Sequence, residues 1–132
     1  MKLKQLWPKI LVFSFTMTLI IGFSSMTGAA MVNVGALNDV TGATSDVGKD
    51  YALGISDAIH YVNDTGGING KKIKLYQFDY GYRIPEALTK YKLYKRLKCV
   101  AVLRWGTGDT EALSPIVTKD KMPYVSASYS AH

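Results

Sequence analysis

The stretch that decides the fold class runs from residue 32 to residue 79 and reads VNVGALNDVTGATSDVGKDYALGISDAIHYVNDTGGINGKKIKLYQFD. Residues 32–37 form a compact apolar run, which is typical of a strand buried on both faces. Residues 38–48 are rich in glycine, threonine, serine and aspartate, so a loop is expected there. From about residue 47 to residue 64 the apolar side chains repeat with the spacing of one helical face, which predicts a helix.

The same alternation of strands and helices continues to the end of the chain. Glycines within residues 65–70 end the helix in a tight turn, and residues 72–79 alternate as a second strand. The remaining expected elements are a helix at residues 85–98, a strand at 99–103, a helix that follows the loop 106–108 with Asp109 or Thr110 as its cap, and a strand at 124–126. Strands joined by helices predict an α/β fold with a parallel sheet, β-α-β-α-β-α-β in sequence and 2-1-3-4 in strand order.

Residues 1–30 have the pattern of an export signal. A short basic segment is followed by a mostly apolar stretch and then by small residues that end in Ala29-Ala30. This pattern predicts a secretory signal peptide cleaved near Ala30, so that the mature chain begins near Met31 and lies in the periplasm or outside the cell. The alternative is an uncleaved membrane anchor, although the apolar run is shorter than the about 20 residues that a spanning helix needs.

Composition excludes several classes of protein. The 132 residues are enough for one domain, and the formal net charge is +6. Three of the 16 basic residues lie in the first 30 positions, which hold no acid, so the rest has 13 basic and 10 acidic side chains. This mild excess argues against a nucleic-acid partner. The single cysteine, Cys99, excludes an internal disulfide and a cysteine-clustered metal site, and its apolar neighbours predict that it is buried.

A ligand site is expected where the strand order reverses, at the carboxyl ends of the strands. Three loops are expected to face it, at residues 38–48, 105–109 and 126–132. In the second loop Gly106, Thr107 and Gly108 lead into a helix, whose unpaired amides and partial positive charge favour a carboxylate. The alternative is that Thr107 and Asp109 only cap this helix.

The other two loops carry weaker signals. In the last loop, the hydroxyls of Ser126, Ser128 and Ser130 and the carbonyls at the strand end are candidates to accept hydrogen bonds from a ligand ammonium group. The first loop has the composition to wrap a small polar ligand. The alternative in both cases is an ordinary polar turn that binds nothing.

No feature of the sequence predicts an enzyme. The glycine-rich stretches lack the spacing of a phosphate-binding or dinucleotide-binding loop, and there is no Gly-x-Ser-x-Gly elbow. His60 falls in the middle of a predicted helix and is expected to be structural. Asp79 ends the second strand, where a hydrogen bond that fixes a turn is the expected role. No catalytic residue, cofactor or metal is therefore predicted.

Several short segments together point to a known family. They are residues 34–42 (VGALNDVTG), 63–73 (NDTGGINGKKI), 79–81 (DYG), 105–112 (WGTGDTEA) and 123–128 (PYVSAS). These segments resemble extracellular solute-binding proteins of the branched-chain (Leu/Ile/Val) amino-acid type, which have the type 1 periplasmic binding protein fold. The resemblance covers about residues 32–132, and the Asn-x-x-Gly-Gly-Ile-x-Gly segment is its most specific mark.

The resemblance implies two α/β lobes with a ligand cleft between them. It also implies delivery of the solute to an importer built from membrane permease and ATPase subunits. By position, Thr107 resembles the hydroxyl that holds the ligand carboxylate, with Gly106 and Gly108 on either side. Ser128 and Ser130 resemble the carbonyl and hydroxyl contacts of the last loop. Val47 falls where amino-acid-specific members place an aromatic residue, and Cys99 does not match the first-lobe disulfide of the family.

Members of the family are roughly three times as long as the mature chain expected here. The sequence therefore predicts a partial first lobe, residues 31–132, that binds ligand poorly by itself. The leading hypothesis is the binding component of an importer for an amino acid or a related small carboxylate or amide. Two alternatives are an exported ligand-sensing domain of a receptor, and a small flavodoxin-like enzyme, which needs a phosphate loop after the first strand.

Overall fold

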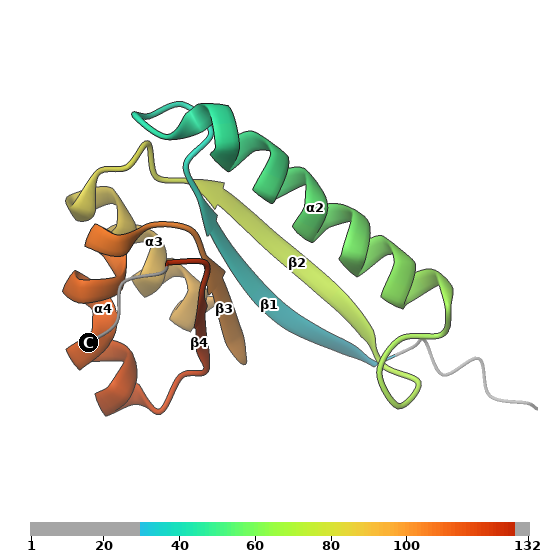
Figure 1. The fold of residues 1–132 in the computed structure, drawn as a ribbon. Coiled ribbons are helices and arrows are strands. Elements are labelled where there is room, and N and C mark those ends of the chain that lie inside the picture. The colour runs from blue at the N-terminus through green and yellow to red at the C-terminus, as the bar shows by residue number, and fades with distance from the viewer. Residues whose placement is uncertain (1–29, 129–132) are drawn as a thin grey trace, which may run out of the picture.

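The computed structural model describes residues 30–128, which form a four-stranded parallel sheet with three helices (Figure 1). The elements are β1 (Met31–Asn38), α2 (Ser45–Asp64), β2 (Lys72–Asp79), α3 (Ile84–Arg96), β3 (Ala101–Arg104), α4 (Thr107–Asp120) and β4 (Tyr124–Ser126). The strand order is β2-β1-β3-β4, which confirms the predicted α/β fold and topology. The expected export signal lies outside the described residues.

The helices are divided between the two faces of the sheet. The strand order reverses at β1, and right-handed crossovers then place α2 on one face and α3 and α4 on the other (Figure 1). The amide of Gln77 on β2 donates to the carbonyl of Ala52 on α2, 2.8 Å away, which ties that helix to its strand. On the opposite face, the Tyr94 hydroxyl of α3 donates to the carbonyl of Ala36 on β1 over 2.6 Å.

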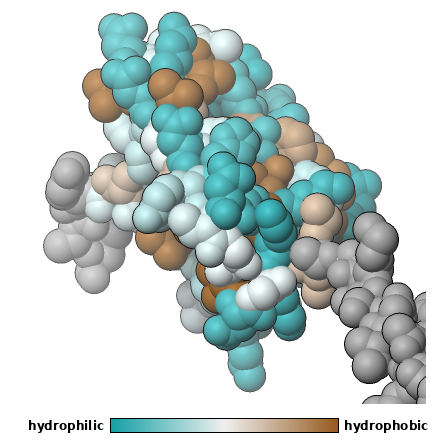
Figure 2. Space-filling view, turned by 90° about the vertical axis from the view of Figure 1, so that its right-hand side faces the viewer, coloured by the Kyte–Doolittle hydropathy of each residue, from teal (hydrophilic) through white to brown (hydrophobic). Residues whose placement is uncertain are grey.

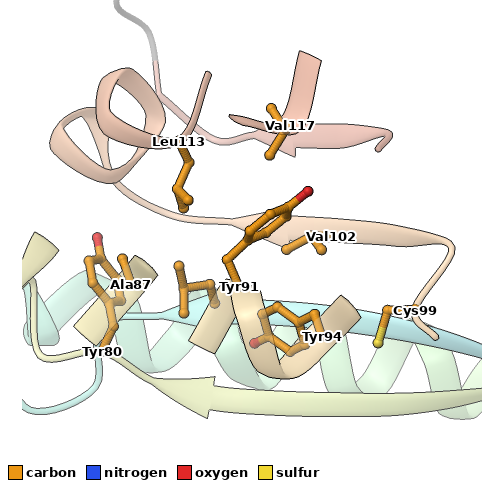
Figure 3. Packing of buried hydrophobic residues seen from close by; sticks show 9 residues of the cluster. Tyr80, Ala87, Tyr91, Tyr94, Cys99, Val102, Leu113 and Val117 are labelled. Carbon is orange, nitrogen blue, oxygen red and sulfur yellow. The ribbon is translucent and has the colours of Figure 1, made fainter. Parts of the chain in front are cut away.

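The hydrophobic core lies between the sheet and the α3–α4 pair (Figure 3). Its buried members are Leu37, Tyr80, Ala87, Tyr91, Tyr94, Cys99, Val102, Leu113 and Val117. The thiol of Cys99 is buried here, as predicted, and burial raises its pKa. Three tyrosines are the largest side chains of this core, so their hydroxyl groups are buried and need hydrogen-bond partners.

Several element boundaries differ from the sequence predictions by one or two residues, and the differences at the third strand and the last helix affect the site. The third strand begins at Ala101 rather than at residue 99, because α3 ends at Arg96 and Lys98 takes a left-handed conformation with φ 55°. The last helix begins at Thr107, so Thr107 and Asp109 lie in its first turn rather than in a loop before it. The prediction that Asp109 or Thr110 caps this helix is therefore wrong, since Gly106 occupies the cap position.

The described surface is mainly hydrophilic on the face shown in Figure 2, with hydrophobic residues in separate small patches. None of the helices among residues 30–128 is long and apolar enough to cross a membrane.

Candidate functional site

The loops at the carboxyl ends of the strands border an open cavity of about 400 Å³. Its lining residues are Thr44, Tyr82, Trp105, Gly106, Thr107, Ala127 and Ser128. The three loops expected to face a ligand all contribute to it, and Tyr82 comes from a fourth loop, between β2 and α3. This is the edge of a parallel sheet at which ligands ordinarily bind.

One wall of the cavity is Trp105, which is held in place by a chain of hydrogen bonds. Its indole Nε1 donates to the Oγ1 of Thr44 over 2.7 Å, and that hydroxyl donates in turn to the Oδ2 of Asp39 over 2.7 Å. Asp39 is fully buried and also accepts from the backbone amides of Gly42 (2.6 Å) and Thr44 (2.8 Å). The first loop is therefore folded around the Asp39 carboxylate, and this arrangement fixes the orientation of the indole.

The floor of the cavity is the start of α4 together with the segment after β4. Thr107 opens the helix at the positive end of its dipole, where the first amides have no backbone acceptor within the helix. The backbone amides of Gly106 and Asp109 bond instead to the Asp109 carboxylate. The hydroxyl oxygens of Thr107 and Ser128 lie 2.7 Å apart, so the two predicted site residues meet at this point. The backbone amide of Ser128 donates to the Oγ of Ser126 over 2.9 Å, which ties the segment after β4 to the strand end.

Glycine at position 106 is required by close packing. A Cβ atom at this position would lie 2.4 Å from the hydroxyl oxygen of Tyr80, 2.5 Å from the Oδ1 of Asp109 and 2.7 Å from the Cε2 of Tyr82. Real Cβ contacts are not this short, so another residue here would push the loop away from both tyrosines. Gly106 thus lets the start of α4 and the β2–α3 loop share one wall of the cavity.

A buried charged cluster lies behind this floor. The Tyr80 hydroxyl donates to the Oδ1 of Asp109 over 2.7 Å, and the Nη1 of Arg104 lies 3.9 Å from the Oδ2 of the same carboxylate. The Arg104 guanidinium also lies 4.0 Å above the ring of Tyr124. Burial raises the pKa of Asp109 and lowers that of Arg104, although each charge favours the ionised form of the other. Arg104 thereby offsets the negative charge that Asp109 brings to this helix end.

The predicted ligand-binding residues fall into three groups. Gly106, Thr107 and Ser128 line the cavity. Gly108, in the first turn of α4, and Val47, which is 60% exposed on α2, are not among the lining residues. Ser130 lies outside the described residues.

Sequence reasoning missed Tyr82 and the wall formed by Trp105. Tyr82 follows β2, and the parallel arrangement alone brings its loop to the same edge as the other three, so the topology could have pointed to it. Asp79 fixes a turn, as predicted: its Oδ1 accepts from the backbone amides of Val40 (2.9 Å) and Gly81 (3.0 Å), and its Oδ2 accepts from the Thr41 hydroxyl. Residues 30–128 contain no group of three or more metal-ligating side chains placed to hold a metal ion.

Comparison with known proteins agrees with this geometry. The sequence profile of the periplasmic binding protein family matches residues 31–132. An amino acid binding protein of Pseudomonas aeruginosa is 35% identical over 68 residues, which are 52% of this chain and 18% of that protein.

Among solved structures, an ABC transporter substrate-binding protein of Aeropyrum pernix is 42% identical with a TM-score of 0.73, over 77% of this chain and 28% of that one. The branched-chain amino acid transporter substrate-binding protein of Streptococcus pneumoniae, solved with isoleucine, is 27% identical with a TM-score of 0.66, over 73% and 28% of the two chains. The chain thus spans less than a third of the length of these relatives. It belongs to the periplasmic binding protein family, a family of non-enzymatic substrate-binding proteins.

Proposed function

We propose that this chain provides one wall of the ligand cleft in the extracytoplasmic binding component of an ABC importer. The ligand is an amino acid or a related small carboxylate or amide. The observation that carries the proposal is the cavity at the start of α4, where the Thr107 and Ser128 hydroxyls meet beside the first amides of a helix. The names of the Pseudomonas, Aeropyrum and Streptococcus relatives support the same class of protein.

The floor of the cavity suits a carboxylate better than a phosphate. The start of α4 and the Thr107–Ser128 hydroxyl pair, whose members share one hydrogen bond, supply donors of modest strength. The positive end of the α4 dipole favours one negative charge. Asp109 lies in the same helical turn and weakens the field that a doubly charged phosphate would require. A carboxylate with one charge and two oxygen atoms matches this set of donors.

The rest of the proposal concerns the whole protein. The leader, residues 1–30, is removed near Ala30 during export, and residues 31–132 form part of a first lobe that acts together with permease and ATPase subunits. The pattern of basic, apolar and small residues supports the cleavage. Mass spectrometry of the exported protein should find a chain that begins near Met31, whereas an intact Met1 in the membrane fraction would contradict it.

The role of Thr107 provides the test of the binding proposal. Thr107→Val keeps the shape of the side chain and removes its hydroxyl, so a buried ligand carboxylate loses one donor. Calorimetry with amino acids should show an affinity that is roughly 5- to 150-fold weaker. The matched control is Thr118→Val, an exposed position later on the same helix, which should leave the affinity unchanged.

A second variant separates ligand contact from loop packing. Ser128→Ala removes the hydroxyl partner of Thr107 and leaves the Thr107 hydroxyl itself in place. If Thr107→Val binds as tightly as Thr118→Val, Thr107 is only part of the helix start and the carboxylate is held elsewhere. Loss of affinity in Ser128→Ala alone would assign the contact to Ser128 rather than to Thr107.

A further inference from the structure

Two pairs of stacked or tilted aromatic rings flank the cavity. In the first pair, the ring centroids of Tyr51 and Trp105 lie 5.1 Å apart with their planes at 43°. In the second pair, the centroids of Tyr80 and Tyr82 lie 5.9 Å apart at 35°. Trp105 and Tyr82 line the cavity, and each of them has the other ring of its pair for support. The cavity therefore has an aromatic lining on two different loops.

The polar ends of three of these four rings are already hydrogen-bonded. The indole nitrogen of Trp105 bonds to Thr44, and the hydroxyl of Tyr51 donates to the carbonyl of Arg104 over 3.1 Å. The Tyr80 hydroxyl bonds to the buried carboxylate of Asp109. Rings fixed in this way need no ordering when a ligand arrives, and such preorganisation lowers the entropic cost of binding.

The aromatic lining and the hydroxyl floor belong to one small cavity. Its volume of about 400 Å³ is near the lower end of the range of about 300–1,000 Å³ that is common for small-molecule sites. Gly106 lies in both parts, since it begins the floor and is packed against the Tyr82 ring. A ligand whose carboxylate meets the Thr107 end therefore brings the rest of its body against Trp105 and Tyr82.

We infer that the site selects carboxylates with a flat aromatic body, which stacks against Trp105 and Tyr82 while the carboxylate binds at the start of α4. The inference rests on the proposed function for the carboxylate and adds the class of the ligand body. Contacts between aromatic rings stabilise a complex beyond the area that they bury, whereas a saturated ring of the same size provides burial alone. The extra stabilisation corresponds to a preference of roughly 2- to 13-fold for the aromatic ligand.

The experiment compares ligands that differ only in the ring. Calorimetry on the 132-residue chain uses benzoate against cyclohexanecarboxylate, and L-phenylalanine against L-cyclohexylalanine. Each pair shares its charge and its carboxylate, so the ratio of affinities reports the ring contact. The aromatic member of each pair is expected to bind roughly 2- to 13-fold more tightly.

Variants of Trp105 assign the preference to this residue. Trp105→Leu should lower the ratio and Trp105→Leu with Tyr82→Leu should bring it to about one, while Trp105→Phe retains a ring and should retain a preference. The control is Tyr61→Leu, an aromatic residue of α2 that is 71% exposed, and it should leave the ratio unchanged. Circular dichroism checks that each variant is folded, and if Trp105→Leu does not fold, Tyr82→Leu replaces it.

The fluorescence of Trp105 can report its contact with the ligand directly. The sequence contains two tryptophans, Trp7 and Trp105, so Trp7→Phe leaves Trp105 as the only one. Its fluorescence should change as benzoate is added, and the change should follow the calorimetric titration.

The outcomes separate this inference from the proposed function. Equal affinities within both pairs, or a preference for the saturated rings, overturn the aromatic selection and leave the carboxylate site intact. Because one wall of a cleft is expected to bind weakly, the titrations extend to millimolar ligand, and failure of the folded chain to bind any of the four carboxylates there overturns both. A preference for aromatic rings that persists in Trp105→Leu and Tyr82→Leu shows that the rings bind elsewhere and also overturns the inference.

Discussion

Three aspartates at the carboxyl edge of the sheet organise the loops around the cavity. Asp39 holds the β1–α2 loop, Asp79 joins the same loop to the end of β2, and Asp109 connects the start of α4 to Tyr80. All three carboxylates accept hydrogen bonds from groups of this chain. They therefore position the residues that line the cavity.

Asp79 should make stability depend on pH in the acid range. Burial raises the pKa of its carboxyl, but hydrogen bonds from Thr41, Val40 and Gly81 outweigh this effect and hold the pKa below its ordinary value. A lowered pKa in the folded state gives stability that is present above the unfolded value of about 3.9 and is lost as the pH falls through the folded value. Asp79→Asn should therefore cost about 1 kcal/mol at neutral pH, and the difference from the parent chain should narrow in strong acid.

Urea denaturation at several pH values measures this effect. The matched control is Asp57→Asn, at an exposed position on α2. A difference between the parent chain and Asp79→Asn that stays constant down to strong acid would show that the ionised carboxylate does not hold the two loops.

The sequence predicts the role of Asp79 better than that of Asp109. Asp79 lies at a strand end and accepts from the amide of Gly81, two residues later, so this turn-fixing role follows from its position, whereas its bonds to Val40 and Thr41 join distant segments. Asp109 is bonded to Tyr80, 29 residues earlier, and Arg104 comes from a third segment. A local pattern suggests a helix cap for Asp109, and only the folded topology places it in the core.

At the scale of elements, the distance between β1 and α3 is set by one glycine. A Cβ atom at Gly35 would lie 2.7 to 2.9 Å from three carbons of the Tyr94 ring. Because this position has no side chain, the ring can lie flat against the strand, where it stacks on Phe78 with centroids 5.5 Å apart. The sequence predicted the strand and the helix from periodicity, but the close approach depends on a pair 59 positions apart, and periodicity does not report such pairs.

The same substitution should therefore have opposite effects at two glycines. Gly35→Ala should destabilise the chain by about 1–3 kcal/mol, because the new methyl group overlaps a buried ring. Gly54→Ala should stabilise it by about 0.5–1 kcal/mol, because Gly54 lies inside α2 with open space where a Cβ atom would be built. Thermal or urea denaturation of both variants tests this contrast. Stabilisation by Gly35→Ala would mean that α3 does not pack on β1 as described.

At the scale of the whole molecule, the alternation of strands and helices was sufficient to predict the α/β class and the strand order. The cavity was predicted only in part. The carboxyl edge and three of its four loops follow from the rule for parallel sheets, and Gly106, Thr107 and Ser128 of these loops line the cavity. The aromatic lining depends on ring pairs between distant segments, which no sequence pattern marked.

Binding of a small carboxylate at this edge of the sheet can be followed directly by a nuclear magnetic resonance titration. The 132-residue chain, labelled with nitrogen-15, is titrated with L-leucine and L-phenylalanine, and the backbone amide resonances are followed. We expect saturable changes in the amide chemical shifts of Gly106, Thr107 and Ser128. We expect none for Gly66 and Gly70, which lie in the turn after α2 at the far end of the molecule (Figure 1). A folded chain whose amides at the start of α4 do not respond to either amino acid, or respond no more than those of the distant turn, would contradict this binding.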